Sequence, residues 1–266
     1  MLEREKSRIR SSFDAATSVV LMVAAGLVIW HTFKAGPQPG PPRGRPGLRI
    51  GNLKNEGLST TVNDAPGHNL GRAKVALIEF SDFECPFCAR YETETFGKLQ
   101  TEFIANGRIQ YIFRHFPLEH SHPHALAAAR AADCAGDQHR FWEMRAKLFE
   151  KQSDLSSSVW LREGATIGLE AGAFERCLRE SRSDRIKADF AEGSRLGVSS
   201  TPTFFIGEAD DKGVVHLLSR IRGAQPVEVF EEALDKALNP TAQEPQKVGL
   251  ARLEASFEQQ ASRGSD

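Results

Sequence analysis

Apolar residues change their spacing several times along the chain, and each change of period predicts a secondary-structure element. Residues 75–80, VALIEF, form a short continuous apolar run, as expected for a strand that is buried on both faces. Apolar residues then recur at helical spacing from 88 to 103, and Asn106-Gly107 supplies a stop signal. Residues 108–116 alternate in polarity and predict a second strand. This strand–helix–strand order predicts a unit with two parallel strands.

From residue 124 to about residue 178 the apolar spacing becomes helical. The region contains an alanine-rich stretch, the amphipathic segment 140–149 (RFWEMRAKLF) and two shorter helical segments. A further helix is predicted at about 184–196, and it ends at Gly197. The region therefore predicts a group of helices and not a continuation of the sheet.

Two strand-like runs follow, PTFFI at 202–206 and VVHLL at 214–218, and then a helix that begins at Pro226. The predicted order is β-α-β, an all-helical insertion, and then α-β-β-α. That is the α/β order of the thioredoxin fold, with a helical domain inserted after the second strand.

The predicted boundaries divide the folded region into a core domain and an insertion. Residues 73–118 and 184–238 form the thioredoxin-fold domain, and residues 119–183 form the helical insertion. Residues 239–266 are polar and are predicted to be a loosely ordered C-terminal tail.

The N-terminal region has a different hydrophobic pattern. Residues 15–33 are nineteen residues without a charge, which as a helix would span about 28 Å, close to the hydrocarbon thickness of a bilayer. Basic residues within segment 1–14 favour a cytoplasmic N-terminus, although basic residues also follow the run. We expect an uncleaved transmembrane anchor in the inner membrane, with the folded domain on the periplasmic side; a cleaved signal peptide and a buried soluble helix are the alternatives.

Residues 34–72, which begin rich in proline and glycine, are predicted to be a linker.

Composition narrows the classes of function. The 266 residues carry a formal net charge of −1, so no overall field favours nucleic acid or acidic partners. Four cysteines are too few for a small disulfide-stapled scaffold, but two of them lie three residues apart in the segment CPFC, at 85–88. The chemistry is therefore expected at this pair.

The CPFC segment is predicted to open the helix that follows the first strand. Cys85 would be the N-cap, Pro86 the first helical residue and Cys88 the third. Free N–H groups and the positive end of the helix dipole would lower the pKa of Cys85 and leave it an exposed thiolate, with Cys88 partly covered one turn in. Residues i and i+3 in a first turn are close enough for a disulfide. The arrangement suits thiol–disulfide exchange.

Two other interpretations of CPFC stay open. A CxxC pair is half of a zinc site, but the sequence has no second CxxC, and His120, His122 and His124 suit a loop that enters a helix better than a tetrahedral cage. An inert structural disulfide is disfavoured, because a bridge that closes so short a loop restricts the unfolded chain little. We expect no metal and no cofactor.

Glu79 lies within the apolar strand 75–80, six residues before Cys85. We expect a desolvated carboxylate beneath the cysteine pair that exchanges protons near neutral pH. The alternative is a charge on an edge strand that faces water. The unbroken apolar run around Glu79 argues against that alternative.

Four separated motifs agree in order and spacing with one known family. They are EFSDFECPFC, FRHFPLEHSHPHALAAARAADCA, FWEMRAKLF and GVSSTPTFFIG. Together they resemble the DsbA-like thioredoxin family of bacteria, over about residues 73–238. The resemblance implies a thiol–disulfide oxidoreductase.

The resemblance also implies roles for individual residues. It implies that Cys85 is the nucleophile, that Cys88 is the resolving cysteine, and that Glu79 is the buried glutamate of the family. It further implies that Pro202 is cis and packs beside the disulfide. The backbone of Thr201 is then expected to pair with an extended substrate peptide.

The residues between the cysteines, Pro86 and Phe87, are also expected to contact substrate. The best-known oxidases of the family have histidine where this chain has Phe87, and an imidazolium would stabilise the thiolate. We therefore expect a pair less oxidising than the roughly −120 mV of DsbA, at about −180 to −230 mV. The family's isomerases carry an N-terminal dimerisation domain, whereas a Pro/Gly-rich linker holds that place here, so a monomer is expected.

Cys134 and Cys177 both fall in the helical insertion. Four cysteines allow three connectivities. If the domain is extracytoplasmic, unpaired thiols would be a liability, so we expect a redox-active Cys85–Cys88 pair and a structural Cys134–Cys177 disulfide. The alternative is that Cys134 and Cys177 are two small buried apolar residues.

These expectations combine into one function and three alternatives. A membrane-tethered oxidoreductase would introduce disulfides into exported proteins, and a quinone-linked membrane protein of the DsbB or vitamin K epoxide reductase (VKOR) type would reoxidise it. The first alternative is a reductase of selected partners, as in cytochrome maturation. The second is a non-catalytic peptide-binding or chaperone module that uses the Thr201-Pro202 edge, and the third is a metal-binding module.

Overall fold

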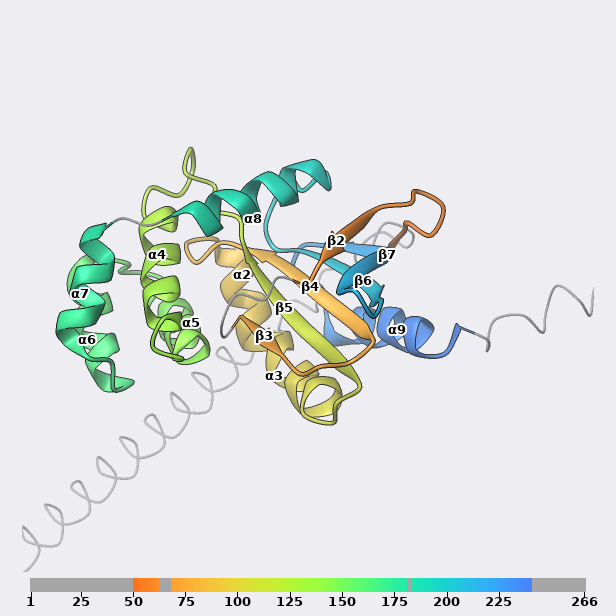
Figure 1. Ribbon diagram of the computed structural model, residues 1–266, viewed down its shortest axis with the longest axis horizontal. Helices are drawn as coiled ribbons and strands as arrows, with labels where there is room; N and C mark the ends of the chain where they lie inside the picture. Colours follow the sequence, from red (N-terminus) through yellow and green to blue (C-terminus); the bar gives the residue numbers. More distant parts are fainter. Residues whose placement is uncertain (1–49, 63–67, 181–182, 241–266) are drawn as a thin grey trace, which may run out of the picture. The chain divides into compact units, whose positions relative to one another are not determined.

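A mixed β-sheet lies at the centre of the described structure, with helices against both of its faces (Figure 1). The computed structural model describes residues 50–62, 68–180 and 183–240. The predicted N-terminus 1–14 and anchor 15–33 lie outside these residues, as does nearly all of the predicted C-terminal tail. None of the helices in the described ranges has the length and hydropathy that a membrane span requires.

The predicted parallel strand pair is present. β4 (Val75–Ser81) and β5 (Ile109–His115) pair in parallel, with Leu77 opposite Tyr111. Every residue of both strands is buried. The continuous apolar run VALIEF is therefore a strand covered on both faces, as predicted.

Two further strands extend the sheet on the other side of β4. β6 (Thr203–Ala209) pairs antiparallel with β4, and β7 (Val214–Arg222) pairs antiparallel with β6. Both strands begin within one residue of the predicted positions but run longer. Helix α9 (Val227–Leu238) follows, with Pro226 as its N-cap. The strand order is β1-β7-β6-β4-β5-β3, and β2 also pairs with β7.

The structure corrects the C-terminal boundary of the predicted linker 34–72. β1 (Ile50–Asn52) and β2 (Ser59–Thr61) pair with β7, and β3 (Asn69–Leu70) pairs with β5. These strands have two or three residues each, too few to show an alternating pattern in the sequence. Their longer partners supply the hydrogen bonds, so part of the expected linker belongs to the sheet.

The helix that CPFC opens is continuous but not uniform. It consists of α2 (Pro86–Tyr91), η1 (Glu92–Phe96), α3 (Gly97–Leu99) and η2 (Gln100–Ile104), in which wider π turns alternate with α turns. Short π segments within helices are frequent at functional sites. The sequence predicts the length of this helix but not its change of pitch.

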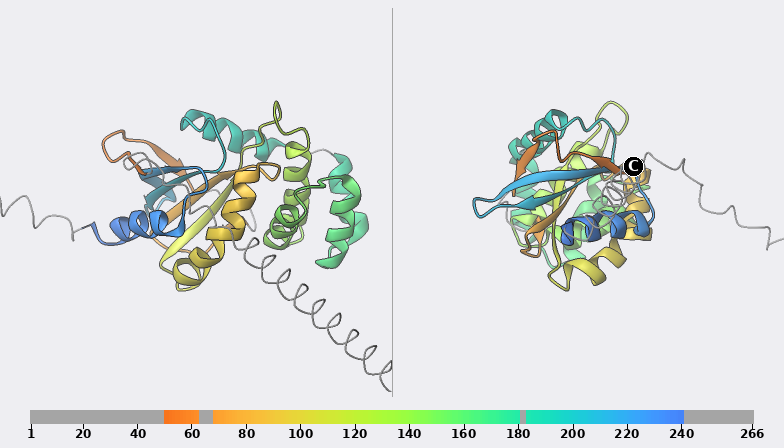
Figure 2. Two further views of the ribbon diagram at one scale, coloured as in Figure 1. Left: turned by 180° about the vertical axis from the view of Figure 1, so that it is seen from behind. Right: turned by 90° about the vertical axis from the view of Figure 1, so that its right-hand side faces the viewer.

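Within the described residues, five helices lie between β5 and β6, as the helical spacing predicts. They are α4 (Ala125–Gly136), α5 (Phe141–Glu150), α6 (Ser157–Thr166), α7 (Ala171–Glu180) and α8 (Asp184–Arg195). Helices α4 to α7 pack on one another at one end of the sheet, and α8 lies against β5 (Figures 1 and 2). The predicted order, a helical insertion after the second strand of the parallel pair, is confirmed.

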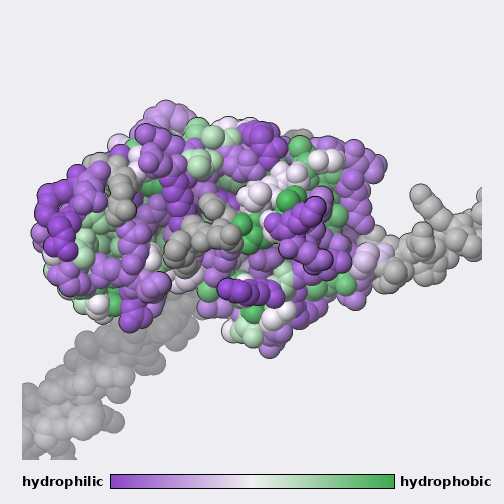
Figure 3. All heavy atoms as spheres, viewed as in Figure 1, coloured by the Kyte–Doolittle hydropathy of each residue, from purple (hydrophilic) through white to green (hydrophobic). Residues whose placement is uncertain are grey.

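Three apolar cores occur among the described residues, one on each face of the sheet and one in the insertion. The insertion core also includes Phe83, Cys85 and Cys88. The cysteine pair therefore lies where the sheet meets the helical insertion. The face of the molecule in Figure 3 is mainly hydrophilic, with apolar residues in small separate areas, as expected when the apolar surface is buried in these cores.

Candidate active site

The segment CPFC opens helix α2, with Cys85 as the N-cap and Pro86 at the first position, as predicted. Cys85 has extended backbone angles, φ −73° and ψ 120°. Its side chain makes no capping hydrogen bond, and its carbonyl oxygen accepts the N–H groups of Cys88 and Ala89 at 3.0 and 3.2 Å. Pro86 removes no helical hydrogen bond, because the first N–H groups of a helix have no partner within the helix.

The two thiols differ strongly in acidity. A hydrogen bond from the Cys88 thiol contributes most to lowering the pKa of Cys85 from 9.0 to about 6, and burial opposes it. Thr201 and the backbone N–H groups of Phe87 and Cys88 lower it further. Burial, followed by the hydrogen bond and charge of Cys85 and the charge of Glu79, raises the pKa of Cys88. At neutral pH the reduced pair is therefore one thiolate and one thiol.

Cys85 is less exposed than the sequence predicts. Its exposed fraction is 4%, against 1% for Cys88, so the expectation of an exposed sulfur is wrong. The loop before β6 covers it, since the Cys85 Sγ lies 3.4 Å from the carbonyl oxygen of Thr201, 116 residues away in sequence. The end of an isolated helix is open, and only the packing of a distant loop closes it.

The Thr201–Pro202 peptide bond is cis, as the resemblance implies. Strand β6 begins at the next residue, Thr203, and the Pro202 carbonyl accepts the N–H of Gly223 at 2.8 Å. This hydrogen bond and the start of β6 hold the loop that contains Thr201 against the sulfur of Cys85. The role of Thr201 and Pro202 in substrate binding stays a prediction.

Phe87 is the most exposed of the large apolar residues in the described ranges, at 52%. The guanidinium of Arg90 lies 5.2 Å from the centre of its ring and donates to the carbonyl oxygen of Ala224 at 3.1 Å. Pro86 is also exposed. An apolar side chain held at the surface beside a reactive sulfur is suited to contact substrate, which is the role predicted for Pro86 and Phe87.

Glu79 is a fully buried carboxylate, as predicted. Tyr111 of β5 donates its hydroxyl to Glu79 Oε2, and Arg145 of α5 lies 3.2 Å from the same oxygen. Among the described residues the other oxygen, Oε1, has no hydrogen-bond partner. The charge of Glu79 contributes to the raised pKa of Cys88, so the carboxylate and this thiol interact.

Arg145 is the site residue that the sequence reasoning missed. Its buried guanidinium bridges Glu92 and Glu79, at 2.5 and 3.2 Å, and lies 4.3 Å from the centre of the Phe96 ring. Burial opposes its charge, but the two carboxylates together raise the pKa of Arg145. Arg145 lies four residues after Phe141, on the apolar face of the predicted helix. A charged residue on that face is the feature of the sequence that could have indicated its buried position.

Three potential metal donors come together at a different place. Among the described residues they are His68, His115 and Asp133, whose donor atoms lie within 4.8 Å of one another. His115 Nε2 lies 2.8 Å from Asp133 Oδ1, an ordinary hydrogen-bond distance, and the guanidinium of Arg185 lies 4.0 Å from the same oxygen. A positive charge so close opposes a bound cation, so this group is better described as a buried hydrogen-bonding cluster.

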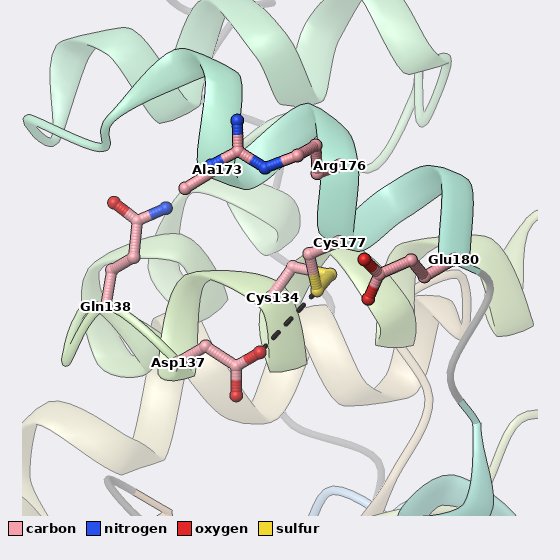
Figure 4. Close-up of a pocket in the computed structure, with 7 residues that line it drawn as sticks. All are labelled: Cys134, Asp137, Gln138, Ala173, Arg176, Cys177 and Glu180. Atoms are coloured by element: carbon pink, nitrogen blue, oxygen red, sulfur yellow. Dashed lines mark hydrogen bonds between the residues drawn. A yellow bond between two sulfur atoms is a disulfide. The ribbon is translucent and has the colours of Figure 1, made fainter.

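Cys134 and Cys177 form a disulfide between α4 and α7, as expected (Figure 4). The disulfide borders a cavity of about 240 Å³. The residues that line it are Cys134, Asp137, Gln138, Ala173, Arg176, Cys177 and Glu180. Asp137 Oδ2 lies 3.6 Å from the Cys177 sulfur. A disulfide sulfur has no proton to donate, so this contact is not a hydrogen bond. It places a carboxylate next to the disulfide.

A thioredoxin-fold sheet, a helical insertion and a cysteine pair at a helix N-terminus define the DsbA-like class of fold. The thioredoxin family model matches residues 67–235, and the chain belongs to this family. A crystal structure of alpha-DsbA1 from Wolbachia pipientis is similar, with 27% identity and a TM-score of 0.56 over 70% of this chain and 96% of that one. Oxidised BdbD from Bacillus subtilis shares the fold at 21% identity, with a TM-score of 0.56 over 67% of this chain and 98% of that one.

Curated relatives with similar sequences carry a different kind of name. Na(+)/H(+) antiporter NhaA 1 of Mycobacterium sp. (strain KMS) is 36% identical over 156 residues, 58% of this chain and 25% of that protein. The protein of the same name from Salinispora arenicola is 35% identical over 194 residues, 71% of this chain and 29% of that protein. The chain spans less than a third of these relatives, so the transport activity in their names is not transferred to it.

Proposed function

We propose that this protein is a thiol–disulfide oxidoreductase that introduces disulfides into exported proteins. The proposal rests on the pKa values of the two thiols, which are lowered for Cys85 and raised for Cys88. A thiolate that is stable at neutral pH is a good leaving group, so a disulfide formed with Cys85 is easily transferred to another thiol.

The exchange begins with the oxidised pair. A substrate thiolate attacks the Cys85 sulfur, the Cys85–Cys88 bond breaks, and Cys88 leaves and takes up a proton. A second substrate thiolate then attacks the substrate sulfur of the mixed disulfide, and Cys85 leaves as a thiolate. The substrate loses two electrons and gains a disulfide, while the protein ends with one thiolate and one thiol. Glu79, whose charge acts on Cys88, would move the proton at that sulfur.

Substrate contact would use the surface around Cys85. The backbone of Thr201 would pair with an extended peptide, and Pro86 and Phe87 would pack against its side chains. The Cys85 sulfur lies 3.4 Å from the Thr201 carbonyl oxygen. Pairing of the substrate backbone with Thr201 would therefore bring the substrate sulfur to Cys85.

The reduced pair requires an electron acceptor. A quinone-linked membrane protein of the DsbB or VKOR type would fill this role, with residues 15–33 as an inner-membrane tether and the folded domain in the periplasm. A tether would confine the domain near such a partner and raise its effective concentration. Antiport is not proposed for this chain.

The test is to trap substrates on the full-length Cys88→Ala variant. Without the resolving cysteine, mixed disulfides should accumulate on Cys85 and disappear on reduction. The control, Cys85→Ser combined with Cys88→Ala, should trap nothing. If both variants carry the same proteins, the protein is a non-catalytic binder. A Cys85–Cys88 pair that is mostly reduced in cells would favour the reductase alternative.

A further inference from the structure

Asp82 joins two loops at the active site. It lies three residues before Cys85, is 2% exposed, and its carbonyl oxygen accepts the Cys85 N–H at 3.2 Å. One carboxylate oxygen accepts the N–H of Glu84, and the other accepts the N–H of Leu118, each at 2.8 Å. Asp82 therefore directs the chain into Cys85 and holds a buried carboxylate in the segment that leads to it.

His122, in the loop between β5 and α4, completes the contacts of this carboxylate. Its Nδ1 lies 2.7 Å from Asp82 Oδ2, although the two residues are 40 positions apart. A carboxylate can only accept, so Nδ1 carries a proton in this pair. The same loop is attached a second time, because the N–H of His124 donates to Glu84 Oε2 at 2.6 Å. The imidazole is thereby held beside the segment that precedes Cys85.

The charges around His122 favour its protonated form. Burial opposes the charge, but the hydrogen bond to Asp82 and the negative charges of Asp82, Cys85 and Glu84 together raise its pKa. Because Cys85 is one of the charges that act on His122, an imidazolium there acts back on the thiolate.

We propose that His122 is a positioning residue for the exchange reaction: as an imidazolium held by Asp82, it stabilises the Cys85 thiolate from a neighbouring loop. It supplies a positive charge that Phe87, within the CPFC segment, cannot supply. The inference deepens the proposed function and rests on it.

The proposal implies a reciprocal coupling between the two residues. If the imidazolium stabilises the thiolate, the thiolate must stabilise the imidazolium by the same free energy. Oxidation converts Cys85 into a neutral disulfide sulfur and removes that stabilisation. His122 should therefore be the stronger base in the reduced protein and the weaker base in the oxidised protein.

The first test measures this coupling in the unmodified full-length chain, purified in detergent with isotope-labelled histidine. NMR titration of His122 should give a higher pKa in the reduced protein than in the oxidised protein. Equal values in the two states would overturn the proposal. This measurement needs no variant and no substrate, so it succeeds or fails independently of turnover.

The second test separates charge from hydrogen bonding. His122→Asn keeps an N–H donor for Asp82 but has no charge. At pH 6 the alkylation of reduced Cys85 should slow by about threefold, because a smaller fraction is thiolate. The equilibrium with glutathione should move by a similar factor toward the oxidised protein. His120→Asn, an exposed neighbour in the same loop, should change neither value.

The outcomes distinguish this inference from the proposed function. An Asn variant that matches the unmodified protein in both readouts would show that His122 acts only through its hydrogen bond, which overturns the electrostatic role. If instead the coupling is present but Cys88→Ala traps no substrate, the proposed function fails while the electrostatic role stands.

Discussion

The two cysteine pairs are almost equally buried, yet only one has the features of an exchange site. Cys85 and Cys88 are 4% and 1% exposed, and Cys134 and Cys177 are 4% and 7% exposed. Burial therefore does not separate them. Cys85 is the N-cap of α2, where the nearby backbone N–H groups of Phe87 and Cys88 lower the pKa of its thiol. Cys134 and Cys177 lie within α4 and α7, where the backbone N–H groups bond within the helices.

The pairs also differ in the length of chain that they close. Cys134 and Cys177 are 43 residues apart, so their bond strongly restricts the unfolded chain. The CPFC pair closes a short loop and restricts the unfolded chain little. Position on a helix and length of loop, more than burial, thus predict one pair that stabilises the fold and one pair that reacts.

The largest expected effect comes from removing the long-range bond. Replacing Cys134 and Cys177 together by alanine should reduce the free energy of unfolding of the oxidised protein by about 4 kcal/mol, because the unfolded chain gains freedom. Urea unfolding measures this loss. Exchange activity of the remaining pair should persist below the new transition. Replacing Cys85 and Cys88 together by serine should cost less stability, and equal losses would remove the distinction between the pairs.

The second prediction concerns the pH dependence of alkylation. Since the pKa of Cys85 is lowered to about 6, its reaction with iodoacetamide in the reduced CPFC pair should be nearly constant above neutrality. Below pH 6 the rate should fall by roughly tenfold per pH unit. The lowered pKa stabilises the reduced fold fully above the usual thiol value of 9.0, and this contribution is lost as the pH falls through about 6. A rate that already falls steadily below pH 9 would contradict the assignment.

A smaller change is expected from Phe87→His. The new imidazole would add positive charge next to the Cys85 thiolate and favour the reduced pair. In equilibrium with glutathione, the ratio of reduced to oxidised protein should rise by about fivefold, which makes the pair more oxidising. Phe87→Leu is the matched control and should leave the ratio close to that of the unmodified protein. An unchanged ratio for histidine would show that the site is already saturated with positive charge.

The smallest effect is expected at the second disulfide. Asp137 Oδ2 lies 3.6 Å from the Cys177 sulfur, so its charge should repel an incoming thiolate. Asp137→Asn should therefore speed the reduction of the Cys134–Cys177 bond by dithiothreitol by about twofold, measured by mass spectrometry. Glu175→Gln, elsewhere on α7, should not change the rate. A slower reduction in the Asn variant would disprove electrostatic protection.

Features that depend on a few neighbouring residues were predictable from the sequence. The N-cap position of Cys85 follows from a proline at the next position and from helical spacing after it. The buried strand around Glu79 follows from its continuous apolar run. The order of strands and helices follows from where the hydrophobic period changes. Each of these is set by interactions within one element or between adjacent elements.

Only the tertiary structure decided which groups surround the reactive sulfur. Arg145 meets Glu79 across 66 positions, His122 meets Asp82 across 40, and the carbonyl of Thr201 reaches Cys85 across 116. The short strands β1, β2 and β3 likewise exist only because longer strands accept them. The sequence by itself determined a cysteine pair at a helix start, directly after an apolar strand that contains a buried glutamate. The charges and the cover that tune this pair come from distant segments, because Coulomb interactions and desolvation depend on distance in space and not on distance along the chain.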